Sequence, residues 1–118
     1  MKTLTIILKS GAMMNMDGNF AVKLAESALK KGHKVNMFFY GEGITAIIDK
    51  QAPKRFPNLG TTIKELMDKG MVVAACSTCA NARGIYEENV IEGCKIGSLT
   101  NDLSKYIADS DRVITLTR

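Results

Sequence analysis

Leu4-Thr5-Ile6-Ile7-Leu8 is an apolar, β-branched run, and this pattern predicts a buried strand. A loop rich in glycine and methionine follows it. Apolar residues then recur at helical spacing from about Asn19 to Lys31, and Gly32 supplies a left-handed stop. The apolar segment 34–40 predicts a second strand. No hairpin signal separates the two strands, so we expect them to run parallel.

The same alternation of strands and helices continues to the end of the chain. Further strands are predicted at 71–75, 94–96 and 112–116. Helical segments are predicted at 44–48, 62–69, 78–83, 86–92 and 103–108, the second opened by a capping box, Thr62-Ile63-Lys64-Glu65, and the last capped near Thr100 or Asn101. We therefore expect an α/β fold. It is a single-domain three-layer sandwich over residues 1–118, with a mostly parallel five-stranded sheet and helices on both faces.

Composition agrees with an ordinary globular protein. The chain has 118 residues, 46% of them hydrophobic and 24% charged, which excludes a disordered or fibrous class. No apolar run approaches the roughly 20 residues that a membrane span needs. The apolar run near the N-terminus is too short for a secretory signal. We therefore expect a cytoplasmic protein with no membrane contact.

The net charge of +4 is mild, and the basic surplus lies in short clusters within the first half of the chain. The chain has no tryptophan, and no aromatic platform accompanies the lysine clusters, so charge alone does not predict nucleic-acid binding. The glycine-bearing loops Ser10-Gly11 and Gly41-Glu42-Gly43 fit neither of the common phosphate-binding patterns. We expect no nucleotide and no other cofactor.

Chemistry in an open parallel sheet gathers outside the carboxyl ends of the strands. Of the loops expected at that edge, one carries a reactive atom, Cys76-Ser77-Thr78-Cys79. Cys76 is expected where a strand stops and a helix begins, and unpaired backbone N–H groups at a helix start favour a thiolate. Ser77 and Thr78 add hydroxyl donors within reach. The small side chains of this loop suggest that a partner molecule can reach the sulfur.

Four interpretations of this loop compete. Cys76 can be an inert structural residue at a strand end, as is expected for Cys94. Thioredoxin-type redox chemistry uses a C-x-x-C at a helix start, but no tryptophan precedes this one and both prolines lie upstream, so no cis-proline can face it. Zinc would need Cys76, Cys79, Cys94 and His33, and His33 begins a strand at its opposite end; we expect no metal. Sulfur transfer needs one nucleophilic, accessible cysteine and no general base.

Three segments resemble the DsrE/DsrF-like family. Residues 38–44, Phe-Phe-Tyr-Gly-Glu-Gly-Ile, resemble its F-F-x-x-[DE]-G-[VI] turn. Residues 76–85 resemble its cysteine loop, which ends in Arg-Gly and an aliphatic residue, and residues 108–116 are similar to its closing strand. The three segments occur in the family's order and spacing, so the resemblance spans nearly the whole chain.

The resemblance implies a small α/β fold of five mostly parallel strands that assembles into trimers or hexamers. It also implies a persulfide-carrying cysteine at Cys76 and protein partners that donate and accept sulfur, in tRNA thiolation or in sulfur metabolism, without direct contact with tRNA. The sequence departs from the relay proteins in carrying Cys79. Whether Cys76 ends as a persulfide or closes a disulfide with Cys79 therefore stays open.

The preferred hypothesis is a cytoplasmic sulfur carrier, or sulfurtransferase-type protein, with Cys76 as the acceptor nucleophile and Cys79 as a possible resolving thiol. Tyr40 and Glu42 would line the neighbouring loop, and Ser77 and Thr78 would stabilise the thiolate. The alternatives are a homo-oligomeric binding or structural protein with inert cysteines, and a thiol–disulfide redox protein. Apolar residues expected near one edge also suggest self-association: Met13, Met14, Met16 and Phe39.

Overall fold

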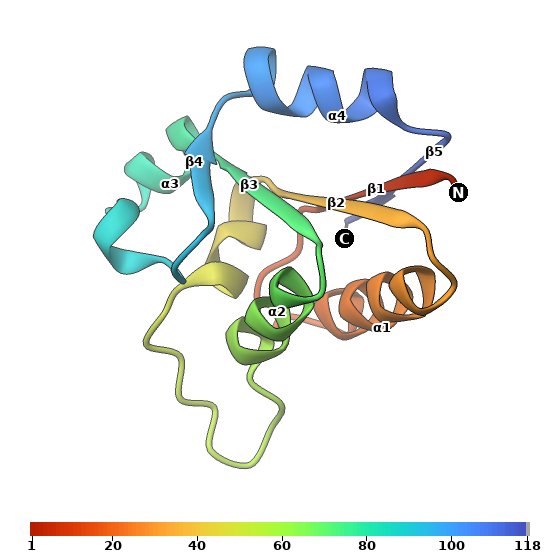
Figure 1. The fold of residues 1–118 in the computed structure, drawn as a ribbon. Helices are drawn as coiled ribbons and strands as arrows, with labels where there is room; N and C mark the ends of the chain where they lie inside the picture. Colours follow the sequence, from red (N-terminus) through yellow and green to blue (C-terminus); the bar gives the residue numbers. More distant parts are fainter. Residues whose placement is uncertain (118) are drawn as a thin grey trace.

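The five strands form one sheet in which every neighbouring pair is parallel (Figure 1). The structure, a computed structural model, describes residues 1–117. The strand order is β4-β3-β2-β1-β5, and the strands are β1 (Thr3–Leu8), β2 (Lys34–Phe39), β3 (Val72–Cys76), β4 (Lys95–Gly97) and β5 (Arg112–Leu116). The α/β prediction is confirmed, and the sheet is wholly rather than mostly parallel.

Helices lie on both faces of this sheet. They are α1 (Asp17–Lys30), α2 (Leu59–Asp68), α3 (Ser77–Ala82) and α4 (Ser104–Asp109), with short 3₁₀ segments η1 (Gly41–Ile47) and η2 (Glu87–Asn89) and a π-type turn η3 (Leu99–Leu103). In Figure 1, α1 and α2 lie below the sheet and α4 lies above it. No helix among residues 1–117 combines the length and the apolar character needed to cross a membrane.

The larger core lies between the sheet and the α1–α2 layer. Alternate residues of a strand point to opposite faces, and Met37 and Phe39 of β2 point into this core, fully buried. Small residues on α1, Ala21 and Ala25, let the helix lie close to the sheet. Burial of each large apolar side chain contributes about 1.5–3 kcal/mol, so most of the fold's stability resides on this side.

The opposite face carries a thinner layer. Phe38, Ala74 and Cys76 form its buried part, and Leu103 and Tyr106 cover them from η3 and α4. The rings of Phe38 and Tyr106 pack edge to face with centroids 6.4 Å apart, an arrangement that aromatic pairs favour. Cys76 is therefore held under a single aromatic-capped layer.

Four local expectations were wrong. The segment 86–92, expected to be helical, contains only the 3₁₀ turn η2, where the Asn89 side chain accepts the Tyr86 N–H. α2 begins at Leu59 rather than at Thr62, because the side chain of Asn58 accepts the Thr61 N–H at 3.1 Å and caps the helix earlier. Near the C-terminus, the cap is Ser98, whose hydroxyl accepts the Asn101 N–H at 2.9 Å ahead of η3. Phe39 is fully buried and adds nothing to the exposed apolar surface. In each case a neighbouring polar group or the strand register decided the outcome.

Gly43 allows η1 to pack directly on the end of β1. A Cβ atom at this position would collide with the carbonyl oxygen of Leu8. That oxygen also accepts the Tyr40 N–H at 3.0 Å, so the turn after β2 is tied to the last residue of β1. The glycine of the 41–43 turn is thus required by a close approach of two backbones.

We predict that Gly43→Ala destabilises the protein by at least about 3 kcal/mol, the upper end of overpacking costs, because the opposing atom is backbone and cannot rotate away. Gly32→Ala is the matched control. It has open space around its Cβ and carries only the left-handed backbone cost of about 1–2 kcal/mol. Chemical denaturation measures both. Equal losses in the two variants would contradict the collision.

Candidate functional site

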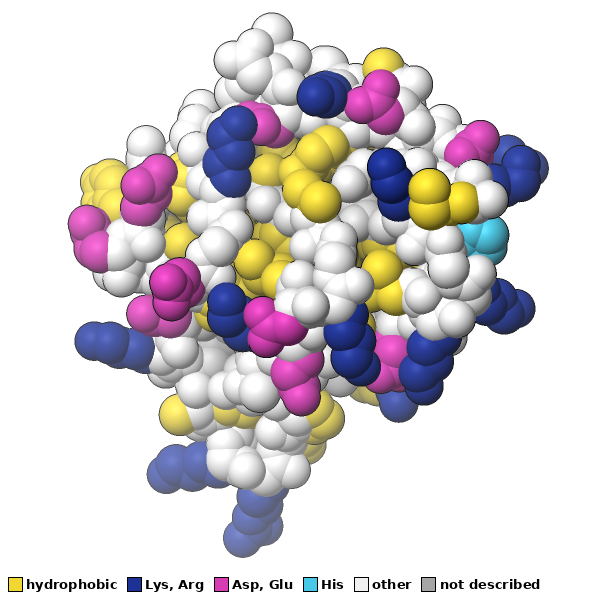
Figure 2. Space-filling model, viewed as in Figure 1, with side chains coloured by type: hydrophobic (Ala, Val, Ile, Leu, Met, Phe, Trp, Pro, Cys, Tyr) yellow, Lys and Arg dark blue, Asp and Glu magenta, His cyan; other side chains and the backbone are white. Residues whose placement is uncertain are grey.

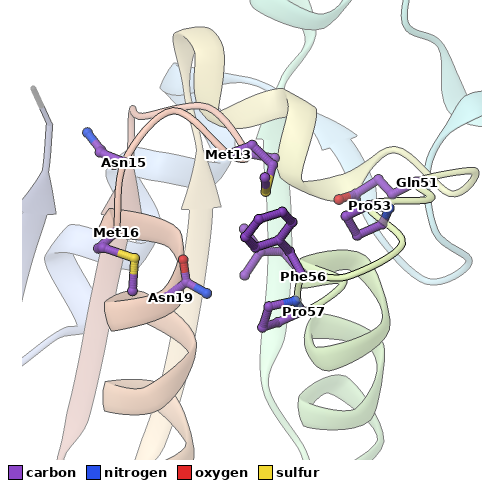
Figure 3. A pocket seen from close by; sticks show the side chains of 10 residues that line it. Met13, Asn15, Met16, Asn19, Gln51, Pro53, Phe56 and Pro57 are labelled. Carbon is purple, nitrogen blue, oxygen red and sulfur yellow. The ribbon is translucent and has the colours of Figure 1, made fainter.

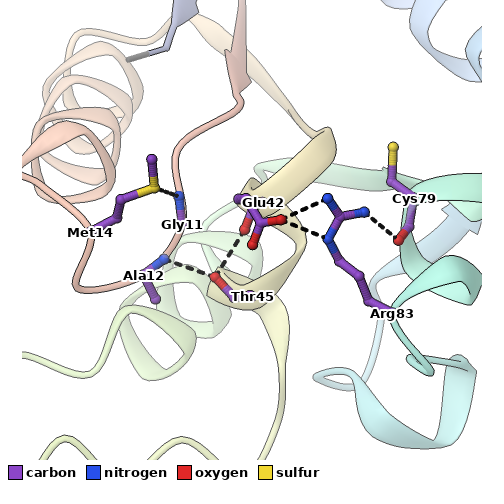
Figure 4. Close-up of polar contacts among 7 residues, drawn as sticks. All are labelled: Gly11, Ala12, Met14, Glu42, Thr45, Cys79 and Arg83. Carbon is purple, nitrogen blue, oxygen red and sulfur yellow. Dashed lines mark hydrogen bonds and ion pairs between the residues drawn. The ribbon is translucent and has the colours of Figure 1, made fainter.

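The carboxyl ends of β1, β2, β3 and β4 meet at one edge of the sheet and bring their loops together. The loop after β1 is tied to η1, since the Ala12 N–H donates to Thr45 Oγ1 at 2.8 Å and that hydroxyl donates to the Glu42 backbone oxygen at 2.9 Å (Figure 4). η1 packs in turn against α3. This chain of contacts sets the position of the Glu42 side chain beside the cysteine loop.

Cys76 and Cys79 occupy the junction of β3 and α3. Cys76 is the last residue of β3 and precedes the first residue of α3 in an extended conformation. Cys79 is half-buried one turn into the helix, packs against Cys76 and interacts with it through the two side chains. Both thiols are free. The C-x-x-C spacing therefore brings two thiols into one contact without joining them.

The burial of Cys76 differs from the accessible sulfur that its loop suggested. Its exposed fraction is 3%, because Phe38, Ala74 and the helix itself surround it. Cys79 is the more exposed of the pair. A molecule approaching from solvent therefore meets Cys79 first.

Arg83 lies one turn beyond Cys79, and its guanidinium lies between the Glu42 carboxylate and the Cys79 carbonyl (Figure 4). Nε and Nη2 donate to Glu42 Oε1 at 3.0 and 2.7 Å, and Nη1 donates to the Cys79 carbonyl at 2.9 Å. The ion pair is partly exposed and adds little stability. Its effect is to hold a cation beside the thiols.

Several groups act on the acidity of Cys79. Burial raises the pKa of its thiol, the Gly41 backbone N–H lowers it, the neighbouring Cys76 raises it and Arg83 lowers it, with a net rise above the ordinary value. Burial alone raises the pKa of Cys94 to about 12. Both residues are therefore mainly thiols at neutral pH.

Four of the six residues singled out from the sequence gather here: Cys76, Cys79, Tyr40 and Glu42. Tyr40 packs against the Cys76 cluster, and the Lys9 ammonium lies 5.4 Å from its ring centroid. Of the other two, Ser77 is half-buried and Thr78 is exposed. Within residues 1–117, neither hydroxyl makes a hydrogen bond to either thiol.

Arg83 is the residue that sequence reasoning left without a role. It belongs to the Arg-Gly ending of the cysteine loop, a pattern that does not indicate its partner. Its spacing of four from Cys79 was the available signal, because residues at i and i+4 share a helix face. Its pairing with Glu42 depends on how η1 packs on α3, which no local pattern reports.

The four ligands weighed for zinc are not brought together. His33 lies at the amino end of the sheet, where its Nδ1 accepts the Lys2 N–H at 3.2 Å, whereas Cys76 and Cys79 lie at the carboxyl end. Within residues 1–117, no cluster of three or more histidine, cysteine or acidic side chains could hold a metal ion.

The protein is thus a three-layer α/β protein with a wholly parallel sheet and a pair of cysteines at the carboxyl edge of that sheet. The chain belongs to the DsrE/DsrF-like family, whose sequence pattern matches residues 2–116. This confirms the resemblance noted from residues 38–44, 76–85 and 108–116.

Individual relatives agree with this assignment. The chain is 36% identical over 95 residues to the uncharacterized protein MJ0989 of Methanocaldococcus jannaschii, covering 80% of this chain and 82% of that one. It is 26% identical over 113 residues to protein YchN of Escherichia coli, covering 93% and 96%. The crystal structure of YchN superposes with a TM-score of 0.85 at 23% identity, covering 98% of this chain and all of that one.

A second solved structure shows the same fold. It is MTH1491 of Methanobacterium thermoautotrophicum, a protein of unknown function, with a TM-score of 0.81 at 12% identity over 98% of this chain and all of that one. At such identities the superpositions report the fold alone.

We predict that alkylation of Cys79 follows a pH midpoint above the ~8.5 of a free cysteine, and that Cys94 stays unlabelled near neutral pH. Arg83→Gln should raise the Cys79 midpoint further, because it removes a cation that favours the thiolate. Arg55→Gln, a distant exposed arginine, is the control. Peptide mass mapping of alkylation against pH measures each site, and an unchanged or lower midpoint in Arg83→Gln would show that the guanidinium does not act on Cys79.

Proposed function

We propose that this protein is a cytoplasmic sulfur carrier that accepts sulfane sulfur as a persulfide on Cys76 and relays it to a partner protein. The observation that carries the proposal is the contact of Cys76 with Cys79, beside Arg83, at the carboxyl edge of the sheet in a DsrE/DsrF-like chain. Persulfide transfer needs one nucleophilic cysteine and no general base.

The transfer is a thiol exchange. The Cys76 thiolate attacks the outer sulfur of a donor persulfide, R–S–SH, and the donor's S–S bond breaks. The new S–S bond leaves Cys76 as a persulfide and the donor as a thiolate, R–S⁻, so no external oxidant or reductant is used. Delivery repeats the same exchange with an acceptor thiol.

Burial of Cys76 would protect a persulfide carried on its sulfur. A persulfide under Phe38 and beside Cys79 is screened from thiols in solution, which would otherwise remove its outer sulfur. Access passes by Cys79 and Arg83, where Glu42 and Tyr40 line the entrance. Donor and acceptor proteins would engage this edge.

Cys79 is the group best placed to remove the persulfide from Cys76. Its thiolate can attack the Cys76 sulfur of the persulfide, forming a Cys76–Cys79 disulfide and releasing hydrosulfide. The raised pKa of Cys79 lowers its thiolate fraction at neutral pH and so slows this loss. A thiol–disulfide redox protein, the second candidate, is favoured by the same contact of two free thiols but needs that attack to be fast.

We predict that wild-type protein treated with inorganic polysulfide gains the mass of one sulfur on the Cys76 peptide. Cys76→Ala should abolish the adduct, because the accepting sulfur is gone, and Cys79→Ala should prolong it. Cys94→Ala is the control and should behave as wild type. Mass spectrometry after digestion reads out each variant. Loss of the adduct in Cys79→Ala, or a wild type that yields only the internal disulfide, would favour the redox protein.

The lifetime of the adduct should also depend on pH. Raising the pH through the pKa of Cys79 increases its thiolate, so the wild-type adduct should decay faster in alkali. In Cys79→Ala the alkaline acceleration should be much weaker. Equal pH dependence in the two proteins would mean that Cys79 is not the attacking group.

Self-association forms a second part of the proposal. Met13, Met14 and Met16 leave much of their side chains exposed on the loop after β1, which is more apolar surface than a small monomer usually carries. We expect a symmetric oligomer, the trimer or hexamer implied by the family. Light scattering at micromolar concentration should return a multiple of 12.9 kDa. The monomer mass would contradict it, and the binding or structural alternative would lose its basis with it.

A further inference from the structure

An apolar groove opens between the loop after β1 and the loop that precedes α2 (Figure 3). A cavity of about 350 Å³ lies between Met13 and Met16 on one side and Phe56 and Pro57 on the other. Met16 is 72% exposed and Phe56 is 58% exposed, so the walls of the groove face solvent. A smaller cavity of about 200 Å³ continues from it along α1 and shares Pro57 and Leu59 with it.

The groove has a basic rim. Lys54 and Arg55 are exposed on the same loop as Phe56, and no acidic residue occurs between Lys50 and Lys64. In Figure 2 basic side chains extend from the tip of this loop at the bottom of the view, with hydrophobic side chains beside them. On the opposite wall, Asp17 accepts a hydrogen bond from the Ser10 hydroxyl at 2.6 Å within its own loop. Glu26 of α1 lines the smaller adjoining cavity, together with Lys23.

The chain also carries a surface of the complementary kind. Tyr86 is 49% exposed, and the two residues after it, Glu87 and Glu88, are exposed as well. No lysine or arginine occurs between Arg83 and Lys95. An aromatic side chain next to exposed carboxylates is the chemistry that a basic-rimmed apolar groove accepts, and tyrosine is enriched at the centres of interfaces.

The two surfaces cannot meet within one chain. η2 is held against the start of the 49–58 loop, where the Asp49 N–H donates to the Asn89 oxygen at 2.9 Å. In Figure 1 the segment that follows α3 lies on the side of that loop facing away from α1, whereas the groove lies on the side facing α1. Two copies can bring them together in a twofold-symmetric pair, where the contact forms twice, or in a head-to-tail arrangement, which generates a ring when the rotation closes.

We propose that the groove receives the Tyr86–Glu88 segment of a second copy of this chain, with Tyr86 seated against Phe56 and the glutamates facing Lys54 and Arg55. The proposal rests on the self-association proposed above and uses no part of the sulfur chemistry. Both surfaces of this contact carry charged side chains, and the charge of each surface can be reversed independently.

Charge reversal with rescue tests the contact. Lys54→Glu with Arg55→Glu, and separately Glu87→Lys with Glu88→Lys, should each weaken assembly at least about tenfold, because like charges then face each other. The four changes combined in one chain should restore assembly, because opposite charges then face each other again. Lys30→Glu with Lys31→Glu, at the far end of α1, is the matched control and should assemble as wild type. Light scattering across a concentration series gives each mass.

The outcomes are separable. A monomeric wild type overturns both this contact and the self-association. An oligomer that survives both double reversals, or one that the four changes fail to restore, overturns this contact alone. Tyr86→Ala adds a charge-independent readout and should also weaken assembly. Persulfide loading of Cys76 in the double variants should match wild type, so failure of the sulfur chemistry would be seen separately.

Discussion

Parallel pairing of β2 with both β1 and β3 is the constraint on which the rest of the structure depends. It brings the loops that follow β1, β2 and β3 to one edge of the sheet. The close approach of Gly43 to the end of β1 fixes the position of the loop after β2. From there η1 carries Glu42 to Arg83, and Arg83 caps the carbonyl of Cys79. A shift of one residue in strand register would turn Cys76 from the thin layer into the α1–α2 core.

The asymmetry of the two helical layers shapes the chemistry. The α1–α2 side holds most of the buried apolar surface and so supports the sheet, while the α4 side covers Phe38 and Cys76 with only a few side chains. A thiol placed under the thinner layer is sheltered without lying deep in the protein. Cys79 packs against both core clusters. In the proposed carrier it would control access to Cys76 and the lifetime of the persulfide there.

Charge in this chain is separated by segment rather than spread evenly. The loop before α2 is basic around an exposed aromatic residue, and the segment after α3 is acidic around another. Both segments adjoin the carboxyl edge of the sheet through η1, since residues 47–49 pair with 89–91. Assembly and sulfur chemistry would thus share one scaffold while using different side chains.

The sequence by itself determined the elements and their order, because apolar runs, helical periodicity and glycine stops are local signals that tertiary contacts here reinforce. It also placed Cys76 at a strand end and Cys79 one turn on, since spacing on a helix start is local too. Only the tertiary structure decided the burial of Cys76, the cap at Asn58 and the pairing of Arg83 with Glu42. Glu42 and Arg83 are 41 positions apart in the sequence. Their contact depends on how η1 packs against α3 at the sheet edge, and no local sequence pattern indicates that two such distant residues are close in space.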